Sequence, residues 1–492
     1  MRFVTVLARF AVRIVVVALV LVLAGLAFRA FDIWRGPQLS LWHTYAPAEL
    51  SIAELDRSDW AAYLAAEERL FTAVQANVSD KLPEAERTPL NRYFTDARNY
   101  PGRFPADWNR SFVIQPSGAP QGVAVLLHGL TDSPYSLRHF ARLYADRGFV
   151  ALGLRLPGHG TVPGALTDIK WEDWSAAVRL ALREARQLAG PDKPVHLVGY
   201  SNGGALAVLH TLEAIAEPAL VKPDQVVLVS PMIGITPFAR FAGLAALPAY
   251  LPGFAAARWL DLMPEFNPFK YNSFPVNAAQ QSYALTQAVQ ARMTALSGRL
   301  ADFPAVLSFQ SVVDHTVSTQ AVINGLHMRL PSGRSELVLF DVNRGATLDF
   351  LLTEEAKGAL RRLLPAAPRP FRSVVVATSA ADTAQAEVQV VEAGGTSIAR
   401  QLLPAPQAYP PTVYSLSHVA MPFPVSDGLY GIAPDPAEDF GIRLGDLVAR
   451  GERGTFTVSE EVLMRIASNP FLPFMLDRVG QTLPAAGQSG AR

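Results

Sequence analysis

Between residues 122 and 342, short apolar runs alternate with longer amphipathic stretches, and this alternation constrains the fold more than any other feature. The apolar runs lack a polar face, so each fits a strand that is buried on both sides of a sheet. Strands of this kind that alternate with helices predict a mostly parallel sheet with helices on both faces. The apolar runs are 122–129, 149–160, 194–201, 225–231, 305–314 and 336–342, and the main helical stretches are 133–147, 171–188 and 202–216.

Two long segments interrupt the alternation, and we interpret both as insertions. The segment 233–303 is rich in Pro, Phe and Ala, and it predicts a cap over a pocket. Apolar cap residues could line an acyl-chain site or simply pack against the core. The segment 345–412 is the second insertion and contains two apolar runs that predict an extra pair of strands, 373–378 and 387–393; a closing helix is expected over 459–476. The apolar residues of the predicted cap are Phe238, Phe241, Leu244, Leu247, Tyr250, Leu251, Phe254 and Trp259.

The N-terminal residues stand out for their hydrophobicity. Residues 14–28 carry no charge, and Arg2, Arg9 and Arg13 precede them. Because a span needs about 20 apolar residues, the run predicts a transmembrane anchor over residues 1–28 if Arg13 reaches the headgroups. A cleaved signal peptide is the alternative. The positive-inside rule places the rest of the chain on the extracytoplasmic, periplasmic side.

A tether (29–47) and a helical segment (48–110) are expected between the anchor and the sheet. Within the helical segment the sequence predicts helices over 48–77 and 84–99. The acidic residues of the first stretch are expected to form its solvent-facing side. They are Glu49, Glu54, Glu67 and Glu68.

Composition excludes several classes of function. The 43 basic and 43 acidic residues cancel, so no overall field attracts nucleic acid, and no nucleic-acid partner is expected. The absence of cysteine excludes disulfides, a thiol nucleophile and a thiolate metal site.

The stretch Gly199-Tyr200-Ser201-Asn202-Gly203 is a G-x-S-x-G sequence between an apolar run and a helical stretch. A serine that leaves a strand and starts a helix within one residue has a strained backbone and an exposed hydroxyl. Gly199 and Gly203 remove the Cβ atoms that would collide in such a turn. The same pattern occurs in ordinary Gly/Ser turns, but the strand–helix context favours Ser201 as a nucleophile.

A nucleophilic serine needs hydrogen-bond donors for the oxyanion that forms on attack. One expected donor is the backbone N–H of Asn202, which follows the nucleophile. The other is the N–H of Leu130, in the loop that begins with His128 and Gly129. We expect His128 to order this loop without transferring a proton.

These motifs resemble the α/β-hydrolase superfamily, on its esterase and monoacylglycerol-lipase-like side. LLHGLTDSPYSLR, LRLPGHG and VGYSNGG occur in the order typical of that superfamily, between residues 122 and 314. The resemblance implies an α/β-hydrolase domain over 111–492 and a Ser-His-Asp triad. The segment SLSHVAMPFP further resembles a bacterial subgroup that is membrane-anchored.

The resemblance places the triad acid after the strand that follows the cap, where Asp314 stands in an Asp-His-Thr-Val turn. An acid there would orient the histidine and stabilise its cation. A helix-capping role is the alternative for Asp314, since a helix is expected next. Asp341 is a weaker candidate.

The histidine departs from the superfamily pattern, because the loop 343–346 contains none. His418 follows the second insertion and keeps the order Ser, Asp, His. We therefore predict His418 as the base and His327 as the runner-up. The other histidines are expected in different roles: His43, His128, His139, His159, His196, His210 and His315.

The predicted reaction is cleavage of a carboxylic ester through an acyl-enzyme, with no metal or organic cofactor. A membrane anchor makes lipid esters a natural substrate class. An acyltransferase or an amidase could use the same triad. A catalytically inactive, membrane-anchored binding module is the fourth interpretation, favoured by the missing histidine at 343–346.

Overall fold

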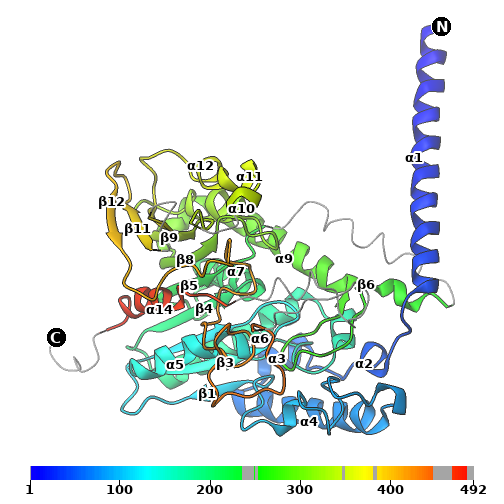
Figure 1. The fold of residues 1–492 in the computed structure, drawn as a ribbon, viewed down its shortest axis with the longest axis horizontal. Coiled ribbons are helices and arrows are strands. Elements are labelled where there is room, and N and C mark those ends of the chain that lie inside the picture. The colour runs from blue at the N-terminus through cyan, green and yellow to red at the C-terminus, as the bar shows by residue number, and fades with distance from the viewer. Residues whose placement is uncertain are drawn as a thin grey trace.

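The computed structural model describes residues 2–234, 249, 253–345, 349–379, 385–446 and 468–484, and a ten-stranded sheet crosses it. The strands are β1 (Phe112–Ile114), β2 (Gly122–Leu127), β3 (Phe149–Leu154), β4 (Val195–Tyr200), β5 (Gln225–Val229), β8 (Ala305–Ser311), β9 (Ser335–Phe340), β10 (Arg372–Thr378), β11 (Ala386–Val391) and β12 (Ala399–Leu402). Their order is β1-β3-β2-β4-β5-β8-β9-β10-β11-β12. Neighbours from β3 to β10 are parallel, whereas β1, β11 and β12 pair antiparallel at the edges (Figure 1). The predicted mostly parallel sheet is confirmed.

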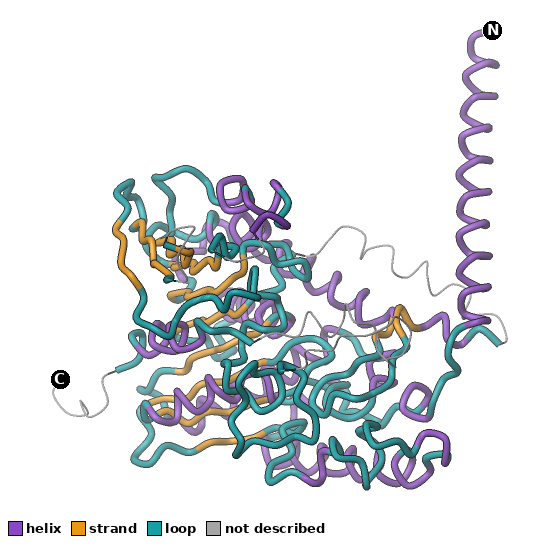
Figure 2. Tube along the Cα trace, viewed as in Figure 1, coloured by secondary structure: helices purple, strands orange, loops and turns teal. Residues whose placement is uncertain are grey.

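Helices cover both faces of this sheet, and Figure 2 shows the strands between them. One face packs against α6 (Trp171–Ala189), α7 (Asn202–Ala216) and α9 (Val276–Ala295). The other packs against α5 (Arg138–Asp146) and α14 (Leu472–Gly480). Alternate residues along β2 enter the two clusters, which is why its sequence is apolar throughout. They are Val123, Val125 and Leu127 on the first face, and Ala124 and Leu126 on the second.

The second insertion enlarges the sheet. β10 pairs with β9 in parallel, and β11 returns antiparallel beside β10. These are the two predicted strands, and β12 extends the edge by one more. The chain therefore adds three strands at this end of the sheet, with β12 at the edge, before it returns toward the middle of the sheet. Of the expected helix over 459–476, residues 459–467 lie outside the described residues, and α14 begins at Leu472.

The helical segment before the sheet differs from its prediction in two places. The first stretch forms α3 (Ile52–Arg57) and α4 (Trp60–Asn77), because Asp59 caps α4 by accepting the Ala62 N–H at 2.8 Å. The helix predicted over 84–99 is wrong, since a short 3₁₀ turn at Glu84–Glu86 is followed by turns. There Asn91 and Asn99 donate to the backbone carbonyls of Glu86 and Leu90, and such side-chain bonds compete with a helix.

The acidic side of this segment is not wholly solvent-facing. Glu54 and Glu68 are exposed, as expected. Glu67 is 3% exposed and Glu49 is also largely covered. Both are ion-paired to the buried Arg155, an arrangement that helical periodicity does not predict.

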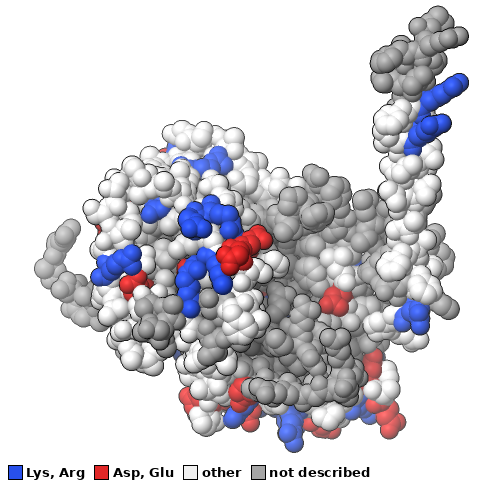
Figure 3. All heavy atoms as spheres, turned by 45° about the horizontal axis from the view of Figure 1, so that its top comes forward, with Lys and Arg blue, Asp and Glu red and all other residues white. Residues whose placement is uncertain are grey.

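The N-terminal helix α1 (Arg2–Arg35) projects away from the rest of the molecule (Figure 1). Its described part is mainly neutral, with basic groups toward its far end (Figure 3). None of the helices among the described residues has both the length and the apolar character of a membrane span. The predicted span over 1–28 is therefore not confirmed.

The described part of the predicted cap contains β6 (Trp259–Asp261), β7 (Phe274–Pro275) and α9. Trp259 is buried and its ring meets His43 edge-on at 4.9 Å between centroids. This residue thus packs against α2 (Leu41–Thr44), where His43 lies. Six of the apolar cap residues lie outside the described residues: Phe238, Phe241, Leu244, Leu247, Tyr250 and Leu251.

Candidate active site

Ser201 occupies a sharp turn between β4 and α7. Its φ of 53° and ψ of −113° are strained for a residue with a side chain. A Cβ on Gly199 would lie 2.4 Å from the carbonyl oxygen of Gly203, and a Cβ on Gly203 would lie 2.0 Å from that of Leu127. Both positions therefore require glycine, and the turn has the geometry of a nucleophile elbow.

The loop after β2 lies directly beside this turn. The Gly203 N–H donates to the His128 carbonyl at 3.1 Å, and a Cβ on Gly129 would lie 3.3 Å from the Ser201 Cβ. In the described part of the chain, the backbone N–H groups of Leu130 and Asn202 have no hydrogen-bond partner. Two unpaired donors next to a serine can stabilise an oxyanion.

His128 fixes this loop as a neutral ring. Its Nε2 accepts the Leu156 N–H at 3.0 Å, so Nδ1 carries the proton and donates to the Gly129 carbonyl at 2.8 Å. Burial holds the pKa of His128 well below its usual value. Both ring nitrogens are engaged, which leaves His128 a loop-ordering role.

Asp314 and His418 are joined by a hydrogen bond of 2.8 Å between Oδ2 and Nδ1. The Asp314 Oδ1 accepts the N–H groups of Thr316 and Val317 at 2.8 and 3.0 Å. Burial raises the pKa of this carboxyl, but His418 and these hydrogen bonds outweigh burial and hold it below its usual value. The alternative capping role does not apply, because Ser318 caps the next helix.

His418 also lies beside the nucleophile turn. The rings of Tyr200 and His418 stack with centroids 5.4 Å apart, and the Tyr200 hydroxyl donates to the His418 carbonyl at 3.2 Å. Because Tyr200 directly precedes Ser201, His418 contacts the residue next to the proposed nucleophile. No hydrogen bond joins His418 to Ser201 among the described residues; such contacts are commonly longer before substrate binds.

The runner-up candidates are engaged elsewhere. His327 is fully buried, contacts the Ser308 hydroxyl at 2.9 Å and has a pKa lowered by burial to about 3. Asp341 pairs with Arg344 at 2.9 Å. Neither residue has a polar contact with Ser201, Asp314 or His418 in the described ranges.

Asp427 fixes the segment after His418 and was not predicted. It accepts the Tyr135 hydroxyl at 2.8 Å and Arg138 Nη1 at 2.7 Å, and it contacts His139 at 3.1 Å. These partners follow the oxyanion loop, so the network ties the loop that carries His418 to the loop that carries Leu130. Tyr200 was also missed; no local motif marks either residue, because their partners lie 218 and 289 positions away.

Within the residues that the structure describes, no cluster of three or more His, Asp or Glu side chains is arranged to hold a metal ion. The groups that the described site brings together are a hydroxyl, an imidazole, a carboxylate and two backbone N–H donors. Together these groups have the composition needed for acyl transfer.

Solved structures with partial likeness include two lipases. A soluble variant of monoglyceride lipase from Saccharomyces cerevisiae is 12% identical, covers 46% of this chain and 81% of its own, and has a TM-score of 0.37. A monoacylglycerol lipase from Paleococcus ferrophilus is 17% identical, covers 47% of this chain and 88% of its own, and has a TM-score of 0.35.

Sequence comparison covers the central part of the chain. The profile of the Hydrolase_4 family, described as serine aminopeptidase, S33, matches residues 118–339. The thermostable monoacylglycerol lipase of Bacillus sp. (strain H-257) is 28% identical over 199 residues, which cover 40% of this chain and 72% of that enzyme. The profile match includes Ser201 and Asp314 and ends before His418.

Proposed function

We propose that this chain, an enzyme of the α/β-hydrolase superfamily on its esterase- and lipase-like side, cleaves carboxylic esters with Ser201, His418 and Asp314. The observation that carries the proposal is the 2.8 Å bond between Asp314 and His418 next to a strained serine turn. A carboxylate bonded to Nδ1 leaves Nε2 as the free base of the imidazole.

The reaction follows from this arrangement. His418 takes the hydroxyl proton as Ser201 attacks the ester carbonyl, and the N–H groups of Leu130 and Asn202 hold the oxyanion. The imidazolium then protonates the leaving alcohol, and Asp314 stabilises its charge. Water hydrolyses the acyl-enzyme by the same route.

We propose a fatty-acid ester, such as a monoacylglycerol, as the substrate. The relative from Bacillus is a monoacylglycerol lipase, whereas the matched family profile is described as an aminopeptidase, so ester and amide bonds must be compared. The purified full chain and Ser201→Ala would be assayed on a monoacylglycerol and on the amide of the same acyl chain. We expect ester turnover that the variant abolishes. Faster turnover of the amide than of the ester would show that the protein is an amidase. Acyl transfer to an added alcohol in preference to water would show that it is an acyltransferase.

We further propose that α1 holds the enzyme at a membrane. Many of its apolar side chains between Phe10 and Phe31 are exposed on a helix that projects from the molecule. Such surface is more stable in lipid than in water. The arginines before residue 14 favour a catalytic domain on the extracytoplasmic side.

Fractionation tests the membrane proposal. The full chain should sediment with membranes, and a chain that starts at residue 36 should stay in the supernatant. Protease added to spheroplasts should digest the catalytic domain if it is extracytoplasmic. Equal solubility of both chains would refute the membrane role, and protection from protease would refute the side.

A further inference from the structure

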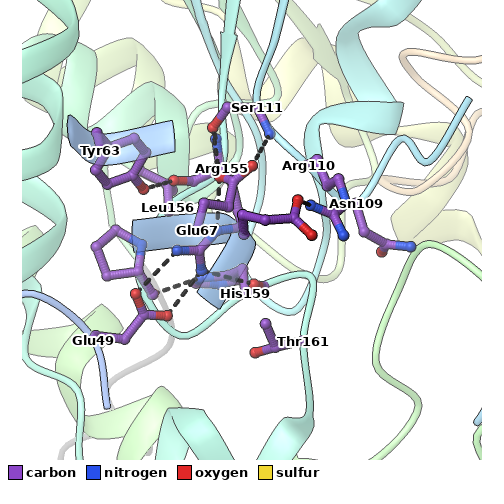
Figure 4. Close-up of polar contacts among 12 residues, drawn as sticks. Glu49, Tyr63, Glu67, Asn109, Arg110, Ser111, Arg155, Leu156, His159 and Thr161 are labelled. Carbon is purple, nitrogen blue, oxygen red and sulfur yellow. Dashed lines mark hydrogen bonds and ion pairs between the residues drawn. The ribbon is translucent and has the colours of Figure 1, made fainter. Parts of the chain in front are cut away.

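A buried arginine joins the N-terminal helical segment to the sheet. Arg155 follows β3 and is fully buried. It donates to both carboxylate oxygens of Glu49, at 2.8 and 3.0 Å, and to Glu67 at 3.0 Å (Figure 4). Glu67 lies on α4 and Glu49 precedes α3, so both carboxylates come from the segment outside the matched family profile. A buried guanidinium without such partners would be strongly destabilising.

The same segment also fixes the backbone of the turn that Arg155 begins. The Tyr63 hydroxyl donates to the Arg155 carbonyl, and the Arg155 N–H donates to Ser111 at 2.9 Å. Glu49 additionally accepts the Gly158 N–H at 2.7 Å. The position of the turn therefore depends on side chains that precede the sheet.

This turn in turn holds the oxyanion loop. The N–H of Leu156, the residue after Arg155, donates to His128 Nε2 at 3.0 Å, and His128 Nδ1 donates to the Gly129 carbonyl at 2.8 Å. The Gly129 carbonyl and the Leu130 N–H belong to one planar peptide group. A hydrogen bond that fixes the direction of that carbonyl therefore fixes the direction of the Leu130 N–H.

We infer that Arg155, with Glu49 and Glu67, is a positioning residue for the oxyanion donor Leu130. The inference rests on the proposed function, since it concerns the same site. The helical segment before the sheet would then affect catalysis through Glu49 and Glu67. The ionic cluster acts through the turn and His128, and it does not touch the reacting atoms.

The experiment compares Glu49→Gln with a milder variant, Tyr63→Phe. The first places an amide N–H group against the guanidinium, and the second removes one hydrogen bond to the Arg155 carbonyl. Asp56→Asn is the matched control, because Asp56 on α3 pairs with Arg179 on α6 at 2.8 Å without contacting the turn. Each protein would be assayed for kcat and KM on one ester and for inhibition by phenylboronic acid, whose tetrahedral serine adduct presents an oxyanion.

A misdirected donor weakens the transition state and the boronate adduct more than it weakens bound substrate. We expect kcat to fall about tenfold or more in Glu49→Gln, with a parallel loss of boronate affinity and KM nearly unchanged. Tyr63→Phe should show the same pattern to a smaller degree, and Asp56→Asn should show none of it. If Glu49→Gln does not fold, the comparison of Tyr63→Phe with Asp56→Asn still tests the inference.

Two results separate the possible failures. Variants with lower thermal stability but wild-type kcat and boronate affinity would overturn the positioning role. A wild-type protein that turns over no ester and binds no boronate would instead overturn the proposed function, before any variant is compared.

Discussion

His418 Nδ1 lies 2.8 Å from Asp314 Oδ2, although the two residues are 104 positions apart in the chain. Between them the chain forms β9 and then the three strands of the second insertion, β10, β11 and β12. Leu416 and Met421, on either side of His418, are buried in the cluster formed with α5 and α14. The histidine thus returns to the site on a segment that the core holds in place.

Replacing the proposed base should nearly eliminate activity. His418→Ala should lower kcat for an ester by at least about a thousandfold, because it removes the imidazole that Asp314 holds as the proposed base. His327→Asn is the control, since His327 contacts Ser308 within the core. Initial-rate kinetics on folded protein check this. Loss of activity in the control with retention in His418→Ala would reassign the base.

Asp314 should make stability depend on acid pH. Its folded pKa is below the unfolded value of about 3.9, so the unfolded chain binds the proton more readily. Its contribution is therefore complete above that value and is lost as the pH falls through the folded pKa. Urea unfolding at pH 7 and pH 3.5 should show a smaller acid-induced loss in Asp314→Asn than in wild type. Identical losses would contradict the assignment.

Gly203 should tolerate no side chain. A Cβ there would lie 2.0 Å from the Leu127 carbonyl oxygen, so Gly203→Ala must push α7 away from β2. We expect insoluble protein or loss of ester turnover. Gly298→Ala is the matched control, because a Cβ at Gly298 meets no atom within 4 Å. Soluble expression, a thermal melt and ester turnover would be compared for the two variants. A fully active Gly203→Ala would refute the elbow geometry.

Asp427 should stabilise the fold substantially. Burial raises the pKa of its carboxyl, but the charge of Arg138 and hydrogen bonds from His139 and the Tyr430 N–H outweigh burial and hold it below the usual range; the side chains of Asp427 and Arg138 are both fully buried. Asp427→Asn should lower the free energy of unfolding by about 3 kcal/mol, since it leaves Arg138 with Glu438 alone. The exposed pair of Glu392 with Arg372 provides the control Glu392→Gln, worth about 0–1 kcal/mol. Equal urea midpoints for the two variants would refute the network.

Local sequence pattern predicted the features that depend on local physics. The parallel sheet followed from runs such as 122–127, which are apolar on both faces. The turn at Ser201 followed from the spacing of Gly199 and Gly203, because the steric demand there is local. The pairing of Asp314 with His418 is not local; its prediction came from the resemblance to the α/β-hydrolase superfamily and the order Ser, Asp, His, and the two side chains lie 2.8 Å apart in the structure.

Local sequence pattern did not predict structure that depends on the partners of a side chain elsewhere in the fold. The sequence predicts that Glu67 lies on the solvent-facing side of its helix. In the structure Glu67 instead accepts a hydrogen bond from Arg155, 88 positions later in the chain. The helix expected over 84–99 gave way to asparagine side chains that bond to the backbone. Neither partner choice has a signature within one helix or strand, so a single sequence does not reveal it.

Labelling with a fluorophosphonate probe tests the central claim most directly, since the probe forms a covalent bond only with an activated serine. Wild type should carry one adduct, which peptide mass spectrometry places on Ser201, and Ser201→Ala should carry none. His418→Ala should label at least about a hundredfold more slowly. Wild type that does not label, an adduct on another serine, or unchanged labelling in His418→Ala would contradict the triad.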